Sequence, residues 1–120
     1  MHTSTGRYEY QFQGHAPAVR NGRYVDGRDF QFLVMDEEGW LYKIPVRLAV
    51  AAEAEVRIIL DKSTVVSEQD AYVESLRIAA LQLRAGLEHY RPRQNAPYAE
   101  LDDYFAVDAG RARQWMRGAV

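Results

Sequence analysis

The sequence contains no cysteine, which excludes a disulfide framework, a thiolate zinc site and a thiol nucleophile. It also has no long hydrophobic run. The longest apolar stretch is the segment Leu48–Ala52, whereas about 18 apolar residues are needed to cross a bilayer. Met1–Ser4 leads directly into polar sequence, so we expect no secretory signal. These absences predict a soluble, cytoplasmic protein without a membrane partner.

The glycine-rich loops of phosphate-binding sites and the nucleophile elbow of hydrolases are missing as well. His2, His15 and His89 lie in three different segments, whereas a zinc site usually has two ligands close in sequence. We therefore predict no metal, no cofactor and no catalytic residue. A small enzyme with a site assembled from scattered carboxylates and His15 or His89 is a further hypothesis.

An acidic group near the C-terminus is the densest candidate for binding a hard cation. It consists of Glu100, Asp102 and Asp103. Because neighbouring residues of a helix point in different directions, we interpret this group as a solvated helix face.

The composition is that of one globular domain spanning residues 1–120, with 48% hydrophobic and 27% charged residues. The net charge of −2 gives no overall attraction to nucleic acid or anionic lipid. Only Lys43 and Lys62 are lysines, so arginine supplies nearly all the positive charge. Arginine suits bidentate binding of phosphate or carboxylate, but we interpret this excess as the codon usage of a GC-rich genome.

The first 60 residues carry the alternating pattern of β-strands. Residues 8–12 alternate between aromatic and polar side chains, which is typical of a half-buried strand. Asn21-Gly22 and Asp26-Gly27 both tolerate a positive φ angle. We expect one of them to close a hairpin and the other to mark a bulge or chain reversal.

The clearest strand pattern lies in residues 40–50, where one face is apolar. That face consists of Trp40, Tyr42, Ile44, Val46, Leu48 and Val50. We predict a hairpin of Phe30–Met35 with Trp40–Val50, joined by the polar turn Asp36–Gly39. Because Pro45 has no N–H to donate, its strand should lie at a sheet edge or carry a bulge.

Residues 49–60 are ambiguous. Ala51–Glu55 has a helical composition, yet Val56, Ile58 and Leu60 continue the two-residue alternation. We favour a break near Ala51–Glu53 and a strand from Glu55 to Leu60. A single helix over 49–60 is the alternative.

After Ser67 the apolar residues recur at steps of three and four. They are Tyr72, Leu76, Ala79, Ala80, Leu83, Leu87 and Tyr90. This spacing predicts a long helix at about 68–90, capped by Ser67 and ended by Arg91-Pro92. Short helices are expected at 97–106 and at 109–117, the second capped by Asp108.

The sequence thus predicts an α+β domain. A mainly antiparallel, twisted sheet of four to five strands (about 8–60) is covered by one long helix (about 68–90), and short C-terminal helices complete the core or a dimer seam. The aromatic strand face should meet the long helix. The residues expected at that contact are Trp40, Tyr42 and Ile44 on the strand and Tyr72, Leu76, Leu83 and Leu87 on the helix.

Eight tyrosines, two tryptophans and many arginines favour protein association, because these residue types dominate interface energetics. We expect a non-enzymatic interaction or regulatory module that binds another protein or forms a homodimer. The predicted interaction residues are Tyr104, Arg113, Trp115 and Met116. The alternative is a nucleic-acid-binding protein that uses the C-terminal arginines and aromatic residues. Acidic residues in the same stretch would repel the nucleic-acid backbone.

Overall fold

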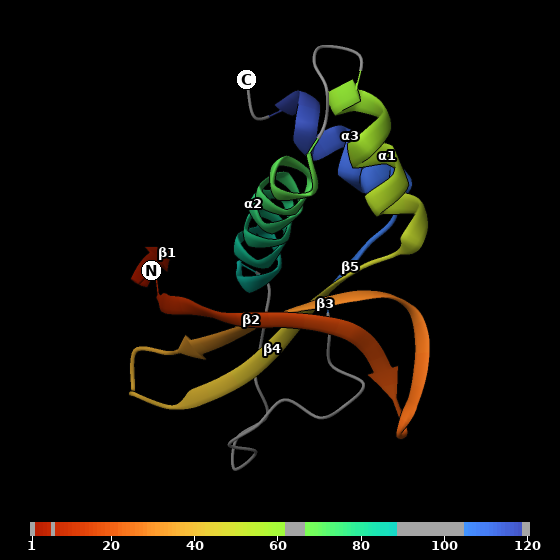
Figure 1. Cartoon of the computed structure of the whole chain (residues 1–120). Coiled ribbons are helices and arrows are strands. Elements are labelled where there is room, and N and C mark those ends of the chain that lie inside the picture. The colour runs from red at the N-terminus through yellow and green to blue at the C-terminus, as the bar shows by residue number, and fades with distance from the viewer. Residues whose placement is uncertain (1, 6, 62–66, 89–104, 119–120) are drawn as a thin grey trace.

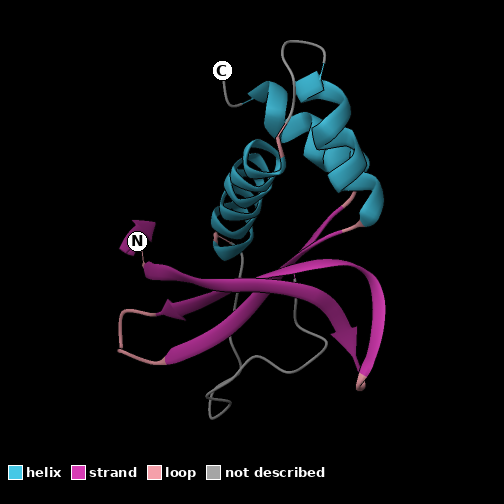
Figure 2. Ribbon diagram, in the orientation of Figure 1, coloured by secondary structure: helices cyan, strands magenta, loops and turns pink. Residues whose placement is uncertain are grey.

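The structure, a computed structural model, describes residues 2–5, 7–61, 67–88 and 105–118. Within them, three helices lie on one side of a five-stranded sheet (Figure 1), and Figure 2 shows the two layers. The elements are β1 (His2–Thr5), β2 (Tyr8–Arg20), β3 (Arg23–Met35), β4 (Leu41–Leu48), α1 (Val50–Asp61), α2 (Glu68–Leu87), β5 (Phe105–Val107) and α3 (Ala109–Gly118). The strands lie side by side in chain order.

The α+β class is confirmed, but the sheet is mixed. Strands β1 to β4 are antiparallel, whereas β5 runs parallel to β4, with Val46 opposite Phe105. A parallel neighbour needs a long crossover connection, and α1 and α2 are part of this one. A three-residue strand carries too short a pattern for its direction to be predicted. Residues 105 and 106 were expected in a helix and instead begin β5; the rest of 97–106 lies outside the described residues.

The two predicted turn signals have different roles, one between β2 and β3 and the other inside β3. Asn21 (φ 53°) and Gly22 (φ 76°) join Arg20 to its partner Arg23 in a two-residue hairpin turn. Gly27 (φ 111°) follows Asp26 where the register between β2 and β3 shifts. A Cβ atom at Gly27 would lie 2.4 Å from the carbonyl oxygen of Leu48, so this bulge requires glycine.

The predicted hairpin of β3 with β4 is confirmed, with Phe32 opposite Ile44. The second strand is shorter than predicted, because it ends at Leu48, and Val50 begins α1 and is 58% exposed. Strand β5 pairs only with residues 46–48, so Pro45 lies where β4 has a single neighbour among the described strands. Trp40 does not belong to the buried face and is 50% exposed. It ends the turn before β4, where its backbone N–H donates to Oδ1 of Asp36 at 2.9 Å.

Helix α1 corrects the preferred prediction for residues 49–60. Glu55–Leu60 is helical, so the alternative of a single helix is right. Ala52 and Val56 are fully buried, and Leu60 packs against the core, whereas Ile58 is 54% exposed. Ala52, Val56 and Leu60 face the core at steps of four residues, which is a helical spacing. This spacing overlaps the two-residue alternation of Val56, Ile58 and Leu60.

Helix α2 begins where predicted, because Oγ of Ser67 accepts the N–H of Asp70 at 3.0 Å. It is 20 residues long and shares its side of the sheet with α1 and α3, so it is not the sole cover that we predicted. The cap of α3 is also confirmed, since Oδ1 of Asp108 accepts the N–H of Arg111 at 2.7 Å.

One hydrophobic core joins the sheet and the helices. It includes Tyr42, Ile44, Leu83 and Leu87 of the predicted strand–helix contact, with Tyr72 and Leu76 packed against it. Trp40 is not part of this core.

Candidate functional site

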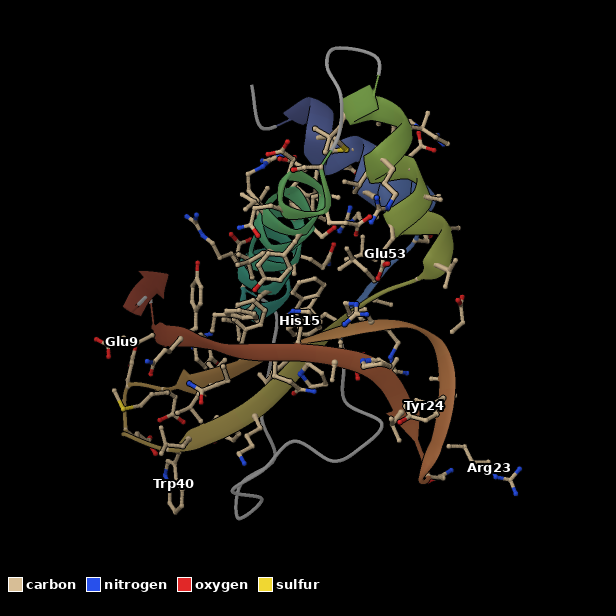
Figure 3. All side chains as sticks on the ribbon, viewed as in Figure 1. Glu9, His15, Arg23, Tyr24, Trp40 and Glu53 are labelled. Atoms are coloured by element: carbon tan, nitrogen blue, oxygen red, sulfur yellow. The ribbon has the colours of Figure 1, made fainter. Side chains whose placement is uncertain are left out.

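A pocket of about 430 Å³ lies where β2, β3, α1 and α2 meet. Each of these elements contributes a polar or aromatic side chain to its lining, among them His15, Arg28, Glu53 and Tyr72. In Figure 3, His15 and Glu53 face one another between the sheet and the helices.

A bulge in β2 places His15 in this pocket. Phe12 lies opposite Phe32, but the next pairs are Gly14 with Gln31 and His15 with Phe30, so β2 holds one extra residue here. The extra residue reverses the alternation, and His15 therefore shares the helix side of the sheet with Phe12. Gly14 has a φ of 138°, which L side chains rarely adopt. A glycine inside a strand pattern is a signal for such a bulge.

Three rings form one wall of the pocket. The ring centroids of His15 and Tyr72 are 4.8 Å apart, those of His15 and Phe30 5.8 Å, and those of Phe30 and Tyr72 6.3 Å. Phe30 is buried in the core, Tyr72 is half-buried and His15 is exposed. The buried phenyl ring thus fixes an aromatic surface that is open to a ligand.

Arg28 links the aromatic wall to Glu53 on α1. One terminal nitrogen of its guanidinium (Nη1) donates to Nδ1 of His15 at 2.8 Å. Because a guanidinium only donates, this bond assigns the imidazole proton to Nε2. The Nε of Arg28 lies 3.9 Å from Oε1 of Glu53. Across the pocket, Nη2 of Arg57 contacts Oε2 of Glu68 at 2.7 Å.

The two carboxyl groups of the pocket differ in acidity. Burial raises the pKa of Glu53, and neighbouring Asp26 raises it further, against the opposing effects of Arg28 and Arg57. The hydrogen bond from Arg57 lowers the pKa of exposed Glu68. A half-buried carboxyl with a raised pKa beside two guanidinium groups is typical of a binding or reactive site.

Of the four predicted interaction residues, the three that the structure describes do not line this pocket. Tyr104 lies outside the described residues, and the other three are on α3. Nε of Arg113 donates to Oε1 of Glu55 at 2.9 Å. Trp115 and Met116 are partly buried against the core of the same chain. Their role in binding a partner stays a prediction.

The polar groups around Trp115 make hydrogen bonds with one another. Its indole N–H donates to Oε1 of Gln82 at 2.9 Å, and Nε of Arg111 donates to the same oxygen, also at 2.9 Å. The guanidinium of Arg111 lies 5.3 Å from the centroid of the indole ring. Arg91 and Arg93, which the nucleic-acid alternative also uses, lie outside the described residues.

Metal binding finds no support in the described residues, where no three histidine, aspartate or glutamate side chains are grouped to hold an ion. The candidates His89, Glu100, Asp102 and Asp103 lie outside them.

None of the helices in the described segments has the length and apolar character needed to cross a membrane. A comparison with protein-family models, curated proteins and solved structures finds no match to this chain.

Proposed function

We propose that this protein binds a small organic anion in the pocket between the sheet and helices α1 and α2. The observation that carries the proposal is that Arg28 on β3 and Arg57 on α1 line one hollow beside an aromatic wall. Arginine forms bidentate, charge-assisted hydrogen bonds with carboxylates and phosphates. A pocket of about 430 Å³ is within the size range of small-molecule sites.

The guanidinium groups are already held in place. Arg28 is positioned by His15 and Arg57 by Glu68. A guanidinium has five N–H donors, and the contacts of Arg28 to His15 and Glu53 involve two of its nitrogens. Donors therefore remain for a ligand, and positioning in advance lowers the entropy cost of binding.

This proposal keeps the expected non-enzymatic role but replaces the expected protein partner with a small anion. It uses the pocket rather than the predicted residues Tyr104, Arg113, Trp115 and Met116. Phenylpropionate is a suitable probe, because it combines a carboxylate with a ring. Isothermal titration should detect its binding, and Arg28→Met should weaken that binding about tenfold or more, since a hydrogen bond to a charged group is lost.

Arg23→Met is the matched control, because Arg23 lies at the far end of the β2–β3 hairpin (Figure 3). Arg57→Met provides a second variant should Arg28→Met fold poorly. Absence of binding, or unchanged binding in a folded Arg28→Met protein, would show that the proposal is wrong.

A second candidate function, self-association, is supported by the β2–β3 hairpin. Beyond the pair of Arg28 with Leu48, this hairpin has no third strand among the described residues. Tyr24 near its end is 80% exposed, and its cross-strand partner Val19 is 43% exposed. Exposed aromatic residues favour interfaces.

We propose that two such hairpins pair in a homodimer. Sedimentation should show a dimer that Tyr24→Ser dissociates, whereas Trp40→Ser at the opposite end of the sheet leaves it intact. A monomer at all concentrations would contradict this candidate. Dissociation by Trp115→Ala but not by Tyr24→Ser would show that the dimer interface lies on α3 instead.

A further inference from the structure

The charges around the pocket balance. Among its described lining residues, Arg28 and Arg57 are positive, and Glu53 and Glu68 are negative. Nδ1 of His15 contacts Arg28 at 2.8 Å. Asp26 acts on Glu53 from outside the described lining of this pocket. Such a site has little net attraction for a dianion and suits a ligand that carries one charge of each sign.

The positions of Arg28 and Glu53 determine how far apart the positive and negative groups of the ligand must be. Their side chains come from different elements, yet Nε and Oε1 are only 3.9 Å apart. This separation is longer than a charge-assisted hydrogen bond of about 2.8 Å, so the pair leaves donor and acceptor capacity for a ligand. In an α-amino acid, the carboxylate and the ammonium are attached to one carbon atom. A carboxylate on Arg28 therefore places the ammonium beside Glu53.

The aromatic wall then defines the side chain of the ligand. The His15 and Tyr72 rings are in contact, with centroids 4.8 Å apart, next to Arg28. Aromatic rings are stabilised by such pairings beyond the effect of simple burial. A flat ring attached to the amino acid is thus favoured over a short aliphatic side chain.

We infer that the pocket binds a free aromatic amino acid, with its carboxylate on Arg28, its ammonium on Glu53 and its ring against His15 and Tyr72. This inference rests on the proposed function, because it requires Arg28 to bind an anionic group. It adds the positive group and the ring as the features that define the ligand.

The test compares L-phenylalanine with three probes that each lack one group. Phenylpropionate lacks the ammonium, phenylethylamine lacks the carboxylate and L-alanine lacks the ring. Isothermal titration should show phenylalanine as the tightest ligand, with phenylpropionate and phenylethylamine about tenfold weaker or more, because each leaves one charged group unpaired. L-Alanine should also bind severalfold more weakly.

Glu53→Gln removes the negative charge and keeps the shape of the side chain. It should weaken phenylalanine binding about tenfold while leaving phenylpropionate binding unchanged or tighter. Glu55→Gln is the matched control on the same helix, because Glu55 contacts Arg113 rather than lining the pocket. Circular dichroism should show that both variants keep the native helix content.

The outcomes separate the two proposals. If phenylpropionate binds as tightly as phenylalanine and Glu53→Gln changes neither affinity, the amino-acid inference is wrong and the anion-binding function stands. Equal binding of alanine and phenylalanine overturns the aromatic part and hence the inference. If no probe binds, both the inference and the proposed function are wrong.

Discussion

Two clusters in this protein are built from the same residue types but differ in whether their polar and aromatic groups already have partners in the same chain. On α3, Trp115 and Arg111 both donate to Gln82, and the indole packs against the core. In the pocket, Arg28 and Tyr72 line a hollow of about 430 Å³. Arginine and aromatic residues therefore do not by themselves mark a binding surface. The difference is whether the same chain already supplies their partners.

The largest effect is expected from Trp115→Ala. It removes a partly buried indole from the core and its hydrogen bond to Gln82, so the free energy of unfolding should fall by about 2 to 4 kcal/mol. Urea denaturation measures this loss. Trp40→Ala is the control, because Trp40 is 50% exposed and its removal should have a much smaller effect. Equal effects of the two substitutions would contradict the conclusion that Trp115 is packed and hydrogen-bonded within its own chain.

Gln82→Ala should have the next largest effect. The side chain is only 9% exposed, and its oxygen accepts from both the Trp115 indole and Arg111. Two donors would lose their acceptor, which should destabilise the protein by about 1 to 3 kcal/mol. Chemical denaturation together with the fluorescence of Trp115 provides the measurement. A variant as stable as wild type would mean that water replaces this acceptor without cost.

In the pocket, Arg28→Met should change the free energy of unfolding by less than about 1 kcal/mol. Its guanidinium is partly exposed, lies 3.9 Å from Glu53 and makes an exposed hydrogen bond with His15. The same denaturation experiment tests this, and a loss as large as that of Trp115→Ala would mean that Arg28 serves the fold rather than a ligand.

The smallest effect is the pH dependence of Glu53→Gln. Burial raises the pKa of Glu53, so between its ordinary value and the raised one the native state binds more protons than the unfolded state. Wild-type stability must therefore fall as pH rises through that window. Glu53→Gln should be more stable than wild type above the window, and the difference should vanish below the ordinary carboxyl range, near pH 4. An increase in the difference toward low pH would contradict the raised pKa.

Local patterns predicted the turns and caps of this fold correctly. Asn21-Gly22 closes a hairpin, and Ser67 caps α2, because each feature depends on a few neighbouring residues. Helix α1 was assigned to the wrong class because two periodicities overlap between Ala52 and Leu60. The parallel strand β5 could not be predicted, since its pairing with β4 depends on segments far apart in the sequence.

The pocket was almost invisible in the sequence. Sequence patterns indicate His15 only as a weak candidate for a metal ligand or for a hypothetical enzyme, and no local pattern marks Arg28, Glu53 or Tyr72 as site residues. These residues lie on four different elements, and His15 enters the pocket only because β2 is bulged at Gly14. A glycine within the strand pattern was the available signal, but the alternation of β2 alone does not fix the register.

One titration followed by two-dimensional NMR tests the contrast between the two clusters most directly. Phenylpropionate is added to isotope-labelled protein, and the amide signals of His15, Glu53 and Tyr72 are followed together with the indole N–H signal of Trp115. We predict saturable shifts of the pocket amides and an unchanged Trp115 indole, which stays hydrogen-bonded to Gln82. Saturable shifts of the Trp115 indole without shifts at the pocket would contradict this account.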